Sequence, residues 1–134
     1  MTTYYFDMDG VLSNFHKEPY SYSKAINREW IANLDPFMNN VAVVKNLIAA
    51  GNKVYILTLA ASENAKLGKL DWLKKYLPEI AEKDVICIVG SGSKVKYIRE
   101  AGVLVDDSAK NTRPWEKAGY PAILLEEKGK TVEL

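Results

Sequence analysis

The nine residues Tyr-Tyr-Phe-Asp-Met-Asp-Gly-Val-Leu at positions 4–12 set the architecture that the rest of the sequence must complete. The aromatic run at positions 4–6 predicts a short buried strand that ends at Asp7. Gly10 indicates a loop directly after it. The pattern therefore places two carboxylates, Asp7 and Asp9, at the carboxyl end of a strand, where parallel α/β sheets bind their ligands.

The same pattern of an apolar strand followed by polar residues recurs downstream. Three apolar runs end in polar groups: 54–57 before Thr58, 85–89 before the loop 90–94, and 103–105 before Asp106 and Asp107. A fifth strand is expected over 122–125 and a last short one over 131–134. Helical spacing, with Ser62 as a cap and Gly51 as a stop, predicts helices over 21–33, 40–50, 62–77, 94–100 and 111–118. This alternation predicts an α/β fold with a parallel sheet and helices on both faces, in a single domain spanning 1–134.

The composition narrows the possible partners and the compartment. The 18 basic and 17 acidic residues give a net charge of +1, so there is no electrostatic signal for nucleic acid or an anionic membrane. No apolar stretch is long enough to span a bilayer, and residues 1–4 do not resemble a signal peptide. Cys87 is the only cysteine, which excludes an intramolecular disulfide and favours a reducing compartment. We expect a cytoplasmic protein; its oligomeric state is left open.

The polar residues at the strand ends suit phosphoryl chemistry. A site lined by carboxylates without histidine or cysteine favours a hard cation with oxygen ligands, above all Mg²⁺. Asp7 could act as the nucleophile, and Asp9 could protonate the leaving oxygen and then deprotonate water. Thr58 could donate a hydrogen bond to phosphate, and Lys94 could add positive charge, although Lys96 is a rival for that role.

Four short motifs in this order resemble those of the haloacid dehalogenase-like (HAD) superfamily. Residues 6–12 resemble its first motif, Ile56-Leu57-Thr58 its second, Lys94 its third and residues 104–107 its fourth. The resemblance extends over nearly the whole chain and implies a Rossmann-like HAD fold and an aspartyl-phosphate intermediate. It makes Asp7, Asp9, Thr58 and Lys94 the expected catalytic residues.

Within that superfamily, the sequence is most similar to the 5′(3′)-deoxyribonucleotidase-like phosphatases. The similarity lies in residues 7–12, Phe15, 33–37, 69–73 and 106–108. It implies that Mg²⁺ is bound by Asp7, by the backbone carbonyl of Asp9 and by Asp106, with Asp107 outside the direct ligands. It also implies a nucleoside monophosphate substrate, held by Thr58, Lys94 and Phe15.

Two departures from the family pattern concern the substrate. Only residues 13–37, approximately, are available for a cap, so this insertion is very short. Leu59 stands where the family usually has Ser or Ala. A phosphatase for another phosphomonoester or a polynucleotide end is therefore an alternative, as is a non-catalytic binding domain. The pair Asp7 and Asp9 argues against the last, since a binding module does not need both.

Overall fold

The computed structural model describes residues 1–134 and contains one sheet of five parallel strands in the order β3-β2-β1-β4-β5. Its strands are β1 (Thr3–Phe6), β2 (Lys53–Ala60), β3 (Val85–Val89), β4 (Val103–Asp106) and β5 (Ala122–Leu124). Every neighbouring pair is parallel. The predicted α/β fold is confirmed.

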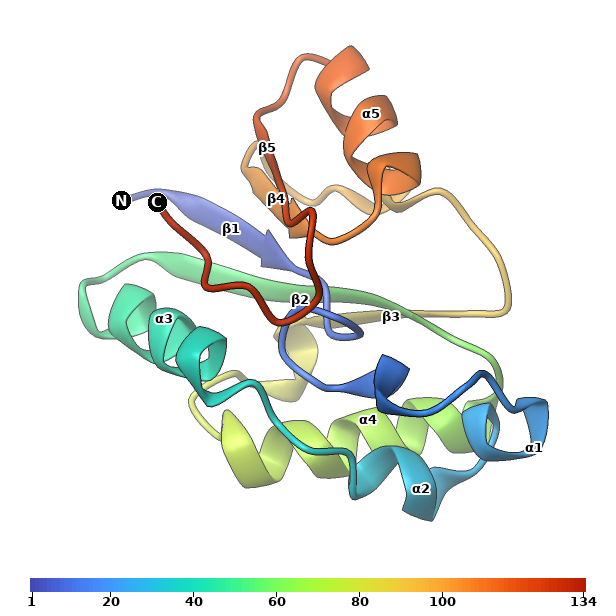
Figure 1. Cartoon of the computed structure of the whole chain (residues 1–134). Helices are drawn as coiled ribbons and strands as arrows, with labels where there is room; N and C mark the ends of the chain where they lie inside the picture. The colour runs from blue at the N-terminus through green and yellow to red at the C-terminus, as the bar shows by residue number, and fades with distance from the viewer.

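Helices cover both faces of the sheet (Figure 1). Their bounds are η1 (Phe15–Lys17), α1 (Tyr22–Ala25), α2 (Arg28–Ala32), α3 (Met38–Ala49), α4 (Glu63–Tyr76), η2 (Glu82–Asp84), η3 (Lys94–Tyr97) and α5 (Ala109–Lys117). Helices α1 to α4 lie on one side of the sheet and α5 on the other. The strand connections therefore alternate with helices, as parallel pairing requires.

Strand β1 is the middle strand of the sheet, and side chains on both of its faces are buried. Phe6 lies in the larger core together with Trp72 of α4. Tyr5 points to the opposite face and stacks on Tyr55 at a ring-centroid distance of 5.0 Å, while Trp115 of α5 meets it edge-on. A strand covered on both sides carries apolar residues at successive positions rather than at alternate ones, which explains the aromatic run at its end.

The strand order reverses between β1 and β4, and the candidate site residues Asp7 and Asp106 lie at the ends of these two strands. The chain runs from β1 to β2 and β3 on one side, then crosses to β4 and β5 on the other. The backbone N–H of Asp7 donates to the carbonyl of Val105 at 2.9 Å, which joins the ends of these two strands. Ligands of open α/β sheets bind at such a switch point.

The helix signals in the sequence were confirmed at two places. The Ser62 hydroxyl accepts a hydrogen bond from the Ala65 N–H at 3.0 Å and caps α4. Gly51 follows α3 with a φ of +88°, a left-handed conformation that favours glycine. These two signals set the end of α3, which precedes β2 in the sequence, and the start of α4, which follows it.

The helix predicted over 21–33 was wrong as one element. The chain forms α1 and α2 instead, and Asn27 separates them with an extended backbone. The Asn27 side chain accepts a hydrogen bond from the Trp30 N–H at 2.8 Å and so starts a new helix. Asparagine is a strong N-cap, and its preference overrides the apolar periodicity that continues across it.

The strand predicted over 131–134 was also wrong, because a buried side chain takes the hydrogen bonds that a strand would use. Asn40 of α3 is fully buried. It donates to the carbonyls of Val11 and Lys130 and accepts from the Val132 N–H, each at 2.9 Å. The final segment, red in Figure 1, therefore runs irregularly over the α3 side and ends near the first strand.

The helix predicted over 94–100 is shorter than expected: it forms only a single turn, η3 (Lys94–Tyr97).

No helix of the structure combines the length and the apolar character that crossing a membrane would require.

We predict that Asn40→Ala lowers the free energy of unfolding by about 1–3 kcal/mol, because buried partners lose their hydrogen bonds. Asn39 is the matched control: it binds the same segment through Gly129 and Thr131 but is exposed. Asn39→Ala should cost no more than about 0.5 kcal/mol. Urea unfolding measures both. Equal losses for the two variants would contradict the role of Asn40.

Candidate active site

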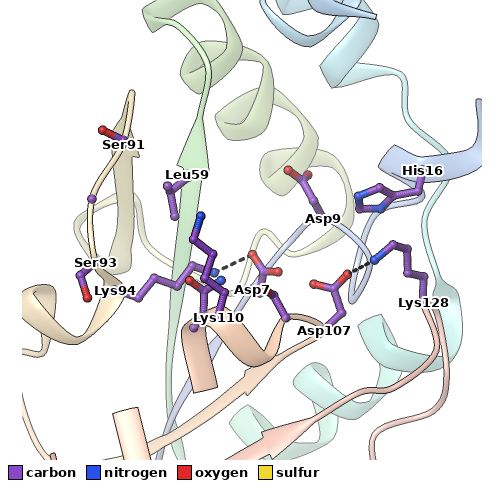
Figure 2. A pocket seen from close by; sticks show the side chains of 13 residues that line it. Asp7, Asp9, His16, Leu59, Ser91, Ser93, Lys94, Asp107, Lys110 and Lys128 are labelled. Atoms are coloured by element: carbon purple, nitrogen blue, oxygen red, sulfur yellow. Dashed lines mark hydrogen bonds and ion pairs between the residues drawn. The ribbon is translucent and has the colours of Figure 1, made fainter. Parts of the chain in front are cut away.

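A polar pocket of about 700 Å³ opens at the carboxyl ends of the central strands. Figure 2 shows its side chains converging from β1, the end of β2, the loop before η3 and the start of α5. The lining residues are Asp7, Asp9, His16, Leu59, Ser91, Gly92, Ser93, Lys94, Asp107, Ser108, Lys110, Asn111 and Lys128. The pocket therefore combines carboxylates and lysines from segments that are far apart in the sequence.

A buried lysine links two of the strand ends. The Lys94 Nζ lies 2.8 Å from Oδ1 of Asp7 and 2.8 Å from Oδ2 of Asp106. Lys94 is 2% exposed and Asp106 is fully buried. Asp106 also accepts hydrogen bonds from the Ser108 N–H at 2.9 Å and from the Asn111 side chain at 3.1 Å. Its carboxylate is thus held by three donors.

Burial and neighbouring charges shift the pKa values of Asp7 and Lys94. Burial raises the pKa of Asp7 well above its usual value; Lys94 opposes the shift, and Asp106 and Asp9 add to it. Burial alone would lower the pKa of Lys94, but the Asp7 and Asp106 carboxylates raise it above the ordinary value. Lys94 is therefore a stable cation, and the carboxylates around it would be further stabilised by another positive charge.

Three carboxylates are close enough to share a cation. Oxygens of Asp7, Asp106 and Asp107 all lie within 4.8 Å of one another. The set contains only oxygen donors and is largely buried, which fits a hard divalent ion such as Mg²⁺. Asp107 is held in this cluster by Lys128, whose Nζ lies 2.7 Å from its Oδ2. The structure places the Asp107 carboxylate beside the two expected ligands.

Asp9 is held by a residue that the motif analysis did not single out. The Nζ of Lys69 on α4 donates to Oδ2 of Asp9 at 3.0 Å and to the Thr58 hydroxyl at 2.7 Å. Lys69 is only 2% exposed. A signal was available, because Lys69 lies four residues after Ala65 and four before Leu73, within the buried stripe of α4. A lysine on such a stripe needs a buried partner.

Gly10 allows the first loop to approach the fourth strand. Its φ is +82°, and a Cβ at this position would collide with the Asp107 carboxylate. The Gly10 carbonyl also accepts the Gly129 N–H at 2.8 Å. Only glycine fits both the conformation and the space, which gives a physical reason for the glycine after Asp9.

The structure distinguishes between the two candidate lysines, and it places two residues expected to contact substrate outside the pocket lining. Lys94 is buried against Asp7, whereas Lys96 is exposed. Thr58 is fully buried, and its hydroxyl contacts Lys69 rather than lining the pocket. Phe15 does not line the pocket either, because its ring packs edge-on against Trp30 at 5.6 Å. Neither Thr58 nor Phe15 lines the pocket, and the substrate contacts expected of them stay predictions.

The pocket also contains three residues that the sequence did not mark as binding groups: His16, Lys110 and Lys128. Burial and then the charge of Lys128 lower the pKa of His16, so its imidazole is neutral at pH 7. Lys128 reaches Asp107 only because the final segment is held across the first loop. Nothing local in the sequence indicates these placements, since they depend on packing between distant segments.

The sequence and the structure were compared with known proteins. Residues 19–129 match the family model described as 5′ nucleotidase, deoxy (pyrimidine), cytosolic type C protein (NT5C). This range includes Lys69, Lys94 and Asp106 but begins after Asp7 and Asp9. No curated protein matches the chain.

A solved structure titled "Structure of Pnkp1/Rnl/Hen1 complex" contains a chain with a similar fold. The TM-score is 0.67 and the sequence identity is 18%, over 92% of this chain and 45% of that one. The protein described here thus spans less than half of that neighbour's length, and the likeness concerns the fold.

We predict that Lys94→Met destabilises the metal-free protein by roughly 3–5 kcal/mol, because two buried carboxylates lose their shared cation. Lys96→Met removes a neighbouring exposed lysine and should change stability by no more than about 0.5 kcal/mol. Urea unfolding in EDTA measures both. A Lys94→Met protein as stable as the control would show that the buried pair does not hold the strand ends together.

Proposed function

The chain belongs to the NT5C family of HAD-type 5′-nucleotidases, and from this premise we propose that it is a Mg²⁺-dependent phosphomonoesterase that acts through an aspartyl-phosphate on Asp7. The observation that carries the proposal is the placement of Asp7 and Asp9 in one pocket, each with its own lysine. The three-carboxylate cluster supports the choice of metal.

The residues that would hold Mg²⁺ are Asp7, Asp106 and the backbone carbonyl of Asp9, as expected from the sequence. Asp107, expected outside the direct ligands, lies close enough to Asp7 and Asp106 to offer a further oxygen. The ion would offset the carboxylate charge and reduce the repulsion between the phosphate and its nucleophile. Lys94 adds a fixed cation beside Asp7, so the pocket provides positive charge where an anionic substrate must approach a carboxylate.

The chemical steps follow from the positions of the two carboxylates. The Asp7 carboxylate attacks phosphorus, and the bond between phosphorus and the leaving oxygen breaks as the new bond forms. Asp9 donates its proton to that leaving oxygen. Asp9 then accepts a proton from water, which attacks the aspartyl-phosphate, releases inorganic phosphate and restores the Asp7 carboxylate.

Lys69 and Thr58 support this exchange by orienting Asp9. Lys69 donates to the Asp9 carboxylate from the α4 side, and the Thr58 hydroxyl accepts a second hydrogen bond from Lys69 and so holds the ammonium in place. Asp9 itself lines the pocket. A general acid is effective only when it is held in reach of the leaving oxygen. We therefore assign Lys69 and Thr58 to the positioning of Asp9.

The substrate class proposed from the family is the nucleoside phosphate. The pocket is open and its cap insertion, approximately 13–37, contains only the short elements η1, α1 and α2 before α3. Few walls surround the place where a base would lie, so discrimination between bases should be weak.

We predict that Asp7→Asn lowers kcat for p-nitrophenyl phosphate by at least about 10³-fold, because the amide cannot serve as the nucleophile. Asp35→Asn is the control, since Asp35 is an exposed partner of Lys17. Turnover should also require Mg²⁺ and stop in EDTA. Asp7→Asn activity within tenfold of wild type would exclude Asp7 as the nucleophile, and full activity in EDTA would exclude the metal.

We predict that Asp9→Asn slows hydrolysis of alkyl phosphates about 10²–10⁴-fold, with a smaller loss for aryl phosphates in single-turnover phosphorylation. Good leaving groups need less protonation. Lys69→Met should show the same alkyl-to-aryl asymmetry with a smaller loss, on the order of tenfold, because it misplaces the acid without removing it. The measurement is the rate ratio for the two substrate types. A uniform loss in both variants would argue against acid catalysis by Asp9.

A further inference from the structure

The pocket is too polar to hold a nucleobase in the usual way. Of its 13 lining residues only Leu59 is hydrophobic, and none is Phe, Tyr or Trp. Proteins that hold bases without strict sequence preference generally stack them on aromatic side chains. Its volume of about 700 Å³ nevertheless lies within the range of small-ligand sites. The space beside the reacting phosphate therefore suits a polar or charged group.

The aromatic residues of the cap insertion do not extend the pocket. Phe15 packs against Trp30, and Trp30 lines separate depressions with residues such as Asn27 and Asn33. Tyr20 and Tyr22 are 70% and 65% exposed and do not line the pocket. A base attached to a substrate in this pocket would lie outside it, in solvent or against the rim.

The charges in the pocket are paired except at one residue. Lys94 is neutralised by Asp7 and Asp106, and Lys128 by Asp107. Lys110 makes no ion pair or side-chain hydrogen bond, and the first turn of α5 contains no acidic residue to offset it. The neutral His16 adds no charge. Lys110 is therefore a free cation in the pocket.

Lys110 reaches the pocket from the first turn of α5. In the view of Figure 2 it stands between Asp7 and the loop that contains Ser91 and Ser93. Both serines line the same pocket and offer hydroxyl groups. Lys110 and this loop form one wall of the pocket, which in Figure 2 lies on the other side of Asp7 from Asp107 and Lys128. A second phosphate is the anion that matches such a wall when the first phosphate faces Asp7.

Resting on the proposed phosphatase function, we propose that the preferred substrate is a nucleotide that carries a second phosphate near the ester that is cleaved, and that Lys110 is the residue that binds this second phosphate. Beside the ester that is cleaved, a nucleoside 3′,5′-bisphosphate presents a second phosphomonoester, and the 3′-phosphorylated end of an oligonucleotide presents a phosphodiester. Recognition through the second phosphate leaves the base outside the pocket and makes it unimportant for selection.

The test compares Lys110→Met with Lys117→Met. Lys117 is an exposed lysine at the other end of α5, outside the pocket, so it matches the change in charge on the same helix. The substrates are p-nitrophenyl phosphate, a deoxynucleoside 5′-monophosphate, its 3′,5′-bisphosphate and a 3′-phosphorylated trinucleotide. The measurement is kcat/KM, with kcat and KM separated.

Wild type should prefer the bisphosphate or the trinucleotide over the monophosphate by about tenfold or more. Lys110→Met should remove most of that preference, mainly through KM, whereas Lys117→Met should retain it. The better of the two doubly phosphorylated substrates identifies the source of the second phosphate, and either result supports the proposal.

Two results would overturn the inference. A wild type that treats the monophosphate and the doubly phosphorylated substrates alike would show that no second phosphate is bound. An equal loss for every substrate in Lys110→Met would place Lys110 on the transferred phosphate instead. The proposed function is tested separately by p-nitrophenyl phosphate: Mg²⁺-dependent turnover of this substrate sustains the phosphatase assignment whether or not Lys110 is selective.

Discussion

The ion pairs between Lys94 and the carboxylates of Asp7 and Asp106 are the interaction on which the site depends. They connect the ends of β1 and β4 to the turn after β3. Carboxylates buried this deeply are tolerated only when a cation compensates them. The strand order supplies the geometry, since the two acids lie at the ends of the neighbouring strands β1 and β4, where the strand order reverses.

The other carboxylates of the pocket follow the same rule, each with a lysine from a different part of the chain. Besides the central pairs, the partners are Lys69 of α4 with Asp9, and Lys128 of the final segment with Asp107. These lysines position the carboxylates before any ligand arrives, which is the preorganisation that electrostatic catalysis requires. Lys110 is the exception, because its charge serves no carboxylate of the protein.

The sequence predicted what depends on local pattern and missed what depends on distant packing. The strand runs, the Ser62 cap and the grouping of Asp7, Asp9 and Asp106 followed from apolar periodicity and the ends of parallel strands. The irregular final segment did not, because its path is set by Asn40, some ninety residues earlier in the chain. Lys69 lies within the stretch 69–73 that resembles the family, but the sequence assigned it no role, because its role depends on Asp9 and Thr58, which it contacts across the fold.

The central place of β1 has a consequence for folding. Strand β1 must pair with β2 and with the more distant β4 before both of its edges are covered. Lys94 and Asp7 are 87 residues apart, so this ion pair forms only after β1 and the segment that follows β3 have come together. Such non-local pairing slows folding and leaves the aromatic strand exposed meanwhile.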